Sequence, residues 1–256
     1  MLPRKSLRSL SRLTEPCCIT ARTVREYHRR SLQPLSKALH SLALQGGSWL
    51  RNFGFLAPLS CLTTLSLRGC HGLKRTDELA ALVSIVTLDL SDCDWLPSLS
   101  GLASLTKLAT LRCGGCERLT DVAAVGGLVS LSHLELNECR SLVDCRALAE
   151  LSNLTVLNVR AVTVDHPSSA GWTWLSSSKL ATLCRLDIGL SNCPGPLPPL
   201  PLLRSLTFDG CTRLRFLARH FAGSESLGAR LGFHPDCTFQ PPLGPETCGL
   251  PHGGIY

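Results

Sequence analysis

The amino-acid sequence predicts an α/β solenoid, an open stack of similar coils whose short strands form one parallel sheet. The first observation is a phrase of the form L-x-x-L-x-L-x-x-C that recurs eight times in the chain. It begins at Leu39, Leu62, Ile85, Leu108, Leu131, Leu154, Leu183 and Leu203. The second is the spacing, which is 23 residues five times in succession, then 29 and then 20. Stacked structural repeats produce equal intervals of this kind, whereas a merely Leu-rich composition does not.

Each coil is expected to hold one strand, one turn and one return segment. With the first Leu counted as position 1, positions 1, 4 and 6 are apolar and nearly alternate with polar residues, which is typical of a half-buried strand. Position 12 is Leu in the first five coils, and positions 18 and 21 are apolar there. This spacing of three favours a short helical or 3₁₀ turn on the return path. Because one coil cannot bury its apolar surface alone, the coils must stack, and their strands then line a concave face.

The cysteines indicate free thiols rather than a disulfide scaffold. Of the 14 cysteines, five occupy position 9 of the phrase, and Cys113 replaces the Leu of position 6. A thiol at a turn that leaves a strand acts as a small buried apolar group and a weak hydrogen-bond donor. Free thiols at this density are typical of reducing compartments. Because no secretory segment and no apolar run of ~18 residues is present, we expect a soluble, cytoplasmic protein. The five thiols are Cys70, Cys93, Cys116, Cys139 and Cys211.

Residues 1–38 form a basic segment unlike the coils. Residues 1–40 hold nine Arg or Lys against Glu15 and Glu26, which accounts for the net charge of +7 and leaves the rest of the chain neutral. Three interpretations stay open: a polar-faced cap on the stack, a mitochondrial transit peptide rich in Arg, Ser and Leu, and a divergent F-box-like helical motif. The third would make the protein a substrate-recognition subunit of a ubiquitin ligase. Against it, Arg4 and Lys5 stand where that motif has an acidic residue.

The phrase and its period resemble those of the leucine-rich repeat family, in the variety with Cys where Asn is commoner. The resemblance covers residues 39–222 and leaves residues 223–256 as a C-terminal cap and a Pro/Gly-rich tail. It implies an arc or horseshoe with parallel strands on the concave face and short helical, 3₁₀ or extended return segments. It also implies a non-enzymatic protein that recognises another macromolecule, usually a protein. Family membership alone does not select the partner.

Candidate partner-binding residues stand at positions 3, 5 and 7, which the strand period places on the concave face. Their charges alternate, with Asp89, Arg112 and Glu135 on successive strands. Such a mixed surface favours a protein partner with complementary charges, whereas nucleic acid calls for a basic stripe. The alternative is that neighbouring opposite charges only pair with each other. The candidates are Arg68, Asp89, Arg112, His133, Glu135, Asn158, Arg160, Arg185 and Asp187.

The coil that starts at Leu154 contains an insertion of six residues together with Trp172 and Trp174. Insertions in repeat arrays go to exposed loops, and an exposed Trp is a favoured anchor at interfaces. The insertion is therefore a candidate contact loop. The alternative is that one of the two rings packs back on the core. The next coil is three residues short and Pro-rich, and we interpret it as a stiff extended return path.

The C-terminal tail contains His234, Cys237, Cys248 and His252 at a spacing that approaches that of zinc ligands. The Pro-rich sequence between them favours a flexible tail instead. The chain has no phosphate-binding glycine loop, no nucleophile elbow and no paired-His zinc helix. We therefore expect no catalytic residue, no cofactor, no metal and a monomer. A zinc-dependent or nucleic-acid-dependent role through the basic leader and the tail is the alternative from a different functional class.

Overall fold

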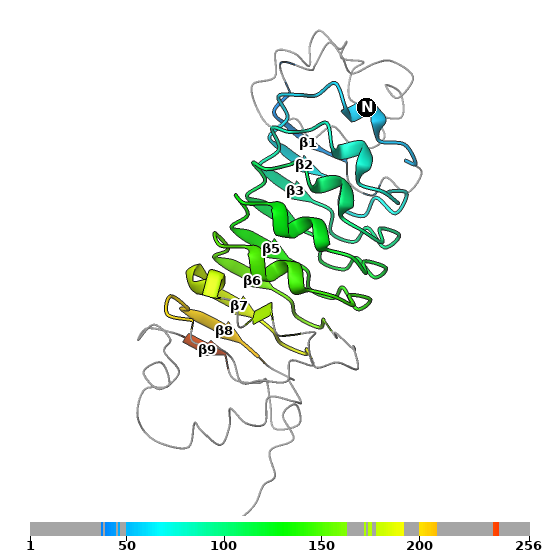
Figure 1. Cartoon of the computed structure of the whole chain (residues 1–256). Coiled ribbons are helices and arrows are strands. Elements are labelled where there is room, and N and C mark those ends of the chain that lie inside the picture. Colours follow the sequence, from blue (N-terminus) through cyan, green and yellow to red (C-terminus); the bar gives the residue numbers. More distant parts are fainter. Residues whose placement is uncertain are drawn as a thin grey trace, which may run out of the picture.

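The computed structural model describes residues 37, 39–44, 46, 50–162, 172, 174–175, 178–191, 200–208 and 238–240. Within these residues, short strands alternate with 3₁₀ helices along a stack of coils (Figure 1). The strands are β1 (Ser41–Ala43), β2 (Thr64–Ser66), β3 (Thr87–Asp89), β4 (Thr110–Arg112), β5 (His133–Glu135), β6 (Val156–Asn158), β7 (Arg185–Asp187), β8 (Ser205–Thr207) and β9 (Thr238–Gln240). The 3₁₀ helices are η2 (Gly54–Leu56), η3 (Asp77–Leu79), η4 (Ser100–Leu102), η5 (Ala123–Gly127), η6 (Arg146–Glu150) and η8 (Ser178–Thr182).

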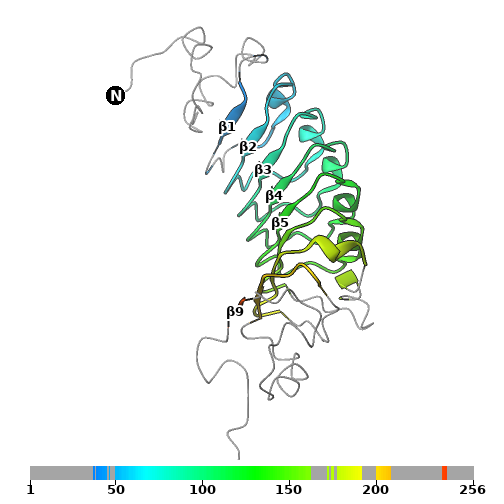
Figure 2. The ribbon, with the colours of Figure 1, turned by 90° about the vertical axis from the view of Figure 1, so that its left-hand side faces the viewer.

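The strands form one parallel sheet in chain order from β1 to β9. Equivalent positions of successive coils face each other, so that Leu65 pairs with Leu88 across β2 and β3. The insertion between β6 and β7 does not change this register, because Leu157 still pairs with Leu186. The sheet follows the concave side of the arc, and the 3₁₀ helices follow the convex side (Figure 2). The predicted solenoid with strands on its concave face is therefore confirmed.

The core is a continuous column of Leu side chains between the two sides of each coil. The central Leu of each strand from β1 to β8 is buried, and most flanking residues are half-buried. Position 15 is also buried, which the sequence analysis did not predict although four of the five residues there are apolar. Thr76 at this position is 1% exposed, and its Oγ1 accepts a hydrogen bond of 2.9 Å from the Gly101 N–H. A buried hydroxyl of this kind is tolerated because it is paired. The position 15 residues are Phe53, Thr76, Leu99, Val122 and Cys145.

The chain leaves each strand from β1 to β7 through a left-handed residue at position 8. Gly46, Gly69 and Gly115 adopt positive φ there, and Leu190 does so at 55°. The N–H of Gly69 donates to the Ser91 carbonyl of the next coil at 2.9 Å. The hydrogen-bond ladder between coils thus extends past the strand before the chain turns. The other left-handed residues at this position are Asp92, Glu138 and Ala161.

The thiols at position 9 form a ladder of hydrogen bonds along the stack. Each described Sγ donates to the position 6 carbonyl of the preceding coil, and the carbonyls of Leu67, Leu90 and Cys113 also accept the position 9 N–H of their own coil. At Leu67 the two donors are the Cys70 N–H at 3.0 Å and the Cys93 Sγ at 3.3 Å. The predicted role as buried donors is confirmed for Cys70, Cys93, Cys116 and Cys139, whereas Cys211 lies outside the described residues. The other thiol contacts are Cys70 to Leu44 at 2.9 Å, Cys116 to Leu90 at 3.2 Å and Cys139 to Cys113 at 3.0 Å.

The C-terminal segment contributes a strand that the sequence did not predict. Thr238–Gln240 forms β9 and pairs in parallel with β8, so that Leu206 faces Phe239. This corrects the expectation of a flexible tail for these three residues. The physical reason is that the edge of β8 presents unpaired backbone groups, which an extended segment of almost any sequence can satisfy. In the described part of the chain, no helix combines the length and the apolar character that a membrane crossing needs.

Candidate functional site

The strand residues that face away from the core gather on the concave face of the sheet. Of the nine candidate residues, seven lie at position 3 or 5 of β3 to β7. Because the sheet is in register, these side chains stand in rows that run across the coils. Arg68 and Arg160 follow β2 and β6 at position 7 and lie at the end of the strands. The seven strand residues are Asp89, Arg112, His133, Glu135, Asn158, Arg185 and Asp187.

A row of alternating charge crosses β3, β4 and β5. The register pairs Asp89 with Arg112 and Arg112 with Glu135. The Nε of Arg112 donates to Oε1 of Glu135 at 3.3 Å, and the two side chains are 44% and 37% exposed. An ion pair with this exposure stabilises the fold by at most about 1 kcal/mol. The charges therefore remain accessible to a partner although two of them contact each other.

Three of the candidate side chains also support the backbone where a strand ends. Asp89, Asn158 and Asp187 each accept a hydrogen bond of 3.0 Å from the backbone N–H two residues further on. This geometry is that of an Asx turn, which stabilises the change of chain direction. Part of the polarity of the concave face thus serves the fold itself.

The arginines at position 7 pair with acidic groups of the next coil. Arg160 lies 3.8 Å from Asp187, and the two side chains are 31% and 23% exposed. Arg68 pairs at 3.0 Å with Asp92, which belongs to the turn after β3. The structure therefore places Arg68 at the border of the concave face and keeps Arg160 beside the β7 row.

His133 and Arg185 are exposed on the concave face, as Arg112 is. The Nδ1 atom of His133 lies 2.9 Å from the hydroxyl oxygen of Ser132. Arg185 forms no salt bridge within the described residues. Its guanidinium offers several N–H donors to a carboxylate of a partner. Arg112 and Arg185 together make this face able to contact acidic groups at two points.

The comparisons with known proteins bear on the fold. No family model and no curated protein matches the chain. Among solved structures, internalin C2 of Listeria monocytogenes matches at 25% sequence identity with a TM-score of 0.52, over 66% of this chain and 69% of that one. The open parallel sheet of this chain and the phrase that repeats in register along it agree with this match. The chain is a leucine-rich repeat protein.

Two further Listeria monocytogenes structures resemble this leucine-rich repeat protein at TM-scores below 0.5. The internalin InlF matches at 18% identity and a TM-score of 0.44, over 70% of this chain and 64% of that one. The functional domain of InlJ, whose description includes a cysteine ladder, matches at 16% identity and a TM-score of 0.42, over 67% of this chain and 44% of that one. At these values neither structure adds to the assignment, which rests on internalin C2.

Four of the six buried thiols described in the leucine-rich repeat protein have a raised pKa, whereas hydrogen bonds with Cys113 and Cys139 lower the pKa of Cys116. Burial raises the pKa of Cys145 to about 12 and raises the pKa of Cys93 even further. Contact with Cys116, and then burial, raises the pKa of Cys113 and of Cys139. A protonated thiol is a poor nucleophile and a poor metal ligand. Within the described ranges, no three His, Cys, Asp or Glu residues are grouped to hold a metal ion.

The two tryptophans of the insertion belong to the core of this leucine-rich repeat protein. Trp172 is 7% exposed and Trp174 is 3% exposed, and their rings stack with centroids 5.8 Å apart. This corrects the expectation of an exposed contact loop for both rings, because an inserted segment needs apolar anchors of its own. The Nε1 atom of Trp174 is buried without a hydrogen-bond acceptor among the described residues. The tail candidates His234, Cys237, Cys248 and His252 lie outside the described residues.

An exposed aromatic residue elsewhere escaped the sequence analysis. Trp95 is 46% exposed on the edge of the stack that follows the strands. The guanidinium carbon of Arg118 lies 3.6 Å from its ring centroid, and the Lys74 ammonium lies at 5.8 Å. These three residues come from successive coils. A comparison of positions 11 and 13 across the coils would have revealed them, but neither position follows the apolar pattern.

Proposed function

We propose that this leucine-rich repeat protein is a non-enzymatic scaffold that binds a protein partner through its concave face. The observation that carries the proposal is the row of alternating, accessible charges on β3 to β5, continued by Arg185 and Asp187 on β7. Groups of both signs favour a protein with complementary charges and fix its register. A nucleic acid calls instead for a continuous basic surface.

The rigidity of the sheet supports the same proposal. Each strand is hydrogen-bonded to its neighbours, and the thiol ladder ties successive coils together at the turn. A face whose side chains stand on such a backbone loses little conformational freedom on binding, which favours affinity.

The test is affinity capture from native cells followed by mass spectrometry, with the full chain and a double charge-reversal variant. Arg112→Glu with Arg185→Glu changes the two donors of the concave face. We expect the main partner to be lost, because both sites of contact for acidic groups become repulsive. The matched control is Lys107→Glu with Lys179→Glu, which changes the net charge equally at exposed positions outside the concave strands. Equal capture by both variants would contradict the proposal.

A chain that starts at Leu39 separates the concave face from the basic leader in the same experiment. Loss of the partner from this shortened chain alone would favour the F-box-like interpretation, in which residues 1–38 dock on a larger ubiquitin-ligase assembly. Mapping the N-terminus of the native protein tests the transit-peptide interpretation, because import would remove the leader. Retention of the partner by the shortened chain is the outcome that the proposal expects.

The proposal places the protein in a reducing compartment, with the cytoplasm as the first expectation and the mitochondrion as the alternative. Its support is that all eight described cysteines are free thiols. Six of them are buried, and four of those donate to backbone carbonyls. An oxidising compartment would act against thiols held at this density.

A further inference from the structure

A second charged surface lies apart from the concave face, on the side of the stack formed by the segments that come directly after the strand and turn of each coil. We call it the basic edge and define it by Arg51, Lys74, Trp95 and Arg118, which come from four successive coils. All four are exposed. Along the stack, two cations come first, then the aromatic ring and then a third cation.

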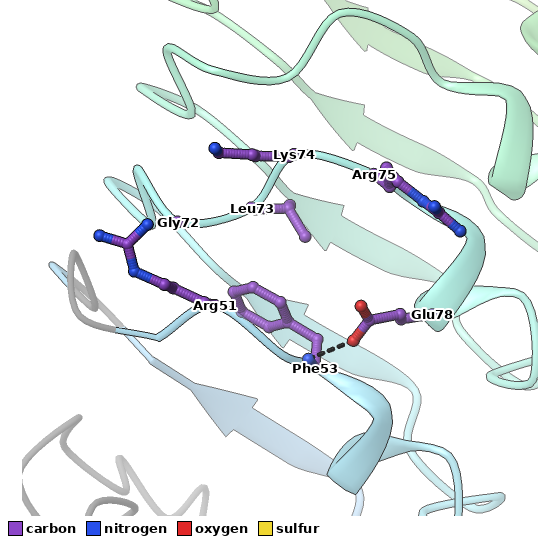
Figure 3. A pocket seen from close by; sticks show the side chains of 7 residues that line it. All are labelled: Arg51, Phe53, Gly72, Leu73, Lys74, Arg75 and Glu78. Atoms are coloured by element: carbon purple, nitrogen blue, oxygen red, sulfur yellow. Dashed lines mark hydrogen bonds between the residues drawn. The ribbon is translucent and has the colours of Figure 1, made fainter.

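A pocket of about 310 Å³ opens on the basic edge. Its inner wall is apolar, since Phe53 and Leu73 are each 1% exposed. The charged ends of Arg51 and Lys74 extend toward the same side of the pocket, while Arg75 and Glu78 lie on the other side of the Phe53 ring (Figure 3). A small anionic group that enters between Arg51 and Lys74 would therefore meet two cations above an apolar wall.

Gly72 explains why the pocket forms at this coil. Gly72 stands at position 11, where the next two coils have Trp95 and Arg118. A Cβ atom on Gly72 would lie 1.8 Å from the carbonyl oxygen of Leu50, so the backbones approach too closely for any side chain. The glycine therefore closes the packing between two coils and leaves the pocket wall without a side chain at this point.

Three cations, Arg51, Lys74 and Arg75, and one carboxylate, Glu78, line the pocket. Glu78 accepts a hydrogen bond from the Phe53 N–H, and Arg75 pairs with Asp77 at 3.1 Å. Arg51, Lys74 and Arg118 form no salt bridge in the part of the chain that the structure describes. Three cations on one narrow edge attract a ligand of opposite charge.

Trp95 holds two of these cations in place. Lys74 of the coil before it and Arg118 of the coil after it both lie against its ring, at 5.8 Å and 3.6 Å from the centroid. Cation–π contacts of this kind order the side chains while their charged ends stay in solvent. The Arg118 guanidinium lies over a face of the ring on which a nucleotide base would otherwise stack.

We propose that the basic edge binds an acidic peptide segment of a partner protein, with one carboxylate between Arg51 and Lys74. Arg binds carboxylates through two parallel hydrogen bonds, and Lys supplies a point charge beside it. An extended peptide places every second side chain about 7 Å apart on one face, and coils are stacked about 5 Å apart at the sheet. The two spacings differ by about 2 Å, a difference that the long, flexible Arg and Lys side chains can take up, so acidic side chains of one extended peptide can reach cations of successive coils. The proposal concerns a surface apart from the concave site and does not depend on it.

The test is fluorescence anisotropy with a dye-labelled hexaglutamate peptide, the full-length protein and physiological salt. Lys74→Glu and Arg51→Glu are each expected to weaken binding by about tenfold, the effect of losing a close charge pair and adding a repulsive one. Lys107→Glu is the matched control, because it makes the same charge change at an exposed residue outside the basic edge. Circular dichroism of each variant checks that the coils remain folded.

The outcomes separate the alternatives. Equal weakening by Lys107→Glu would mean that the peptide senses only net charge and would overturn the proposal. So would tighter binding of a labelled oligouridine that is also lost in Lys74→Glu, because the surface would then serve a nucleic acid. In the background of Arg112→Glu with Arg185→Glu, which removes the two donors of the concave face, Lys74→Glu is still expected to weaken peptide binding by about tenfold. No further weakening in that background would place the peptide on the concave face and would also contradict the proposal.

Discussion

At the scale of single residues, the thiol of position 9 is small enough for the turn and still able to donate a hydrogen bond. The carbonyl of Leu67 accepts both the Cys70 N–H and the Cys93 thiol. A buried carbonyl has two lone pairs, and filling both lowers the cost of burying it. Val162 stands at the same position and offers no donor, so the ladder is interrupted in that coil. The sequence pattern was sufficient to assign this role to the cysteines because it repeats at one position.

Replacing Cys93 by Ala tests the ladder. The change removes the thiol that donates to Leu67 and leaves a small cavity in a fully buried position. We expect the free energy of unfolding to fall by about 1–2 kcal/mol, as measured by chemical denaturation. Cys61→Ala is the control, since Cys61 is only half-buried and donates no hydrogen bond that the ladder needs. Equal losses in the two variants would show that the thiol at position 9 has no special role.

At the scale of the elements, the turn after the strand requires a backbone conformation that residues other than glycine disfavour, while the stacking of the coils imposes it. A left-handed residue is required at position 8 because the backbone ladder continues through it, yet four of the seven described residues there are not glycine. For residues with a Cβ, this conformation costs about 1–2 kcal/mol. Asp92 belongs to a type that adopts it more readily, whereas Leu190 does not. The stacking of the coils compensates for this strain.

Leu190→Gly is therefore expected to stabilise the protein. The side chain is 49% exposed, so little apolar burial is lost, while the strain at φ 55° is relieved. After subtraction of the greater flexibility of glycine in the unfolded chain, we expect a gain of about 0.5–1 kcal/mol. The reverse change, Gly69→Ala at φ 67°, is expected to cost about 1 kcal/mol. Thermal denaturation of both variants decides the matter, and a loss of stability in Leu190→Gly would refute the argument.

At the scale of the whole molecule, the solenoid has one continuous hydrophobic core, and this core contains titratable thiols. Burial raises the pKa of Cys145 from 9.0 to about 12. Between these values the folded protein keeps a proton that the unfolded chain loses. The free energy of unfolding therefore falls as the pH rises through this window, by up to about 1.4 kcal/mol per pH unit for one thiol. Below pH 9 the full contribution is present.

Cys145→Val isolates this effect. Val is the residue that the preceding coil has at the same position, as Val122, so the substitution fits the core. We expect the stability of this variant to decline less steeply than that of the parent between pH 9 and 12, as followed by denaturant titration at each pH. Parallel declines of Cys145→Val and the parent would contradict the expected contribution.

The sequence by itself determined what repeats. A period of 23 residues places equivalent residues at equivalent points of the coil, so strands, buried Leu positions and the cysteine slot followed from the spacing. The register of the sheet then placed Asp89, Arg112 and Glu135 side by side without further information. For these features, local pattern and global packing agree because each coil meets a copy of itself.

Only the tertiary structure decided what does not repeat. The burial of Trp172 and Trp174 depends on the apolar residues against which the insertion packs, and the repeat pattern does not predict those contacts. β9 forms because an open sheet edge accepts a further strand, whatever the sequence that supplies it. The basic edge joins Lys74 to Trp95 and Arg118 through contacts between different positions of different coils. Such contacts arise from packing in three dimensions, whereas a sequence pattern reports only which residues share the same environment.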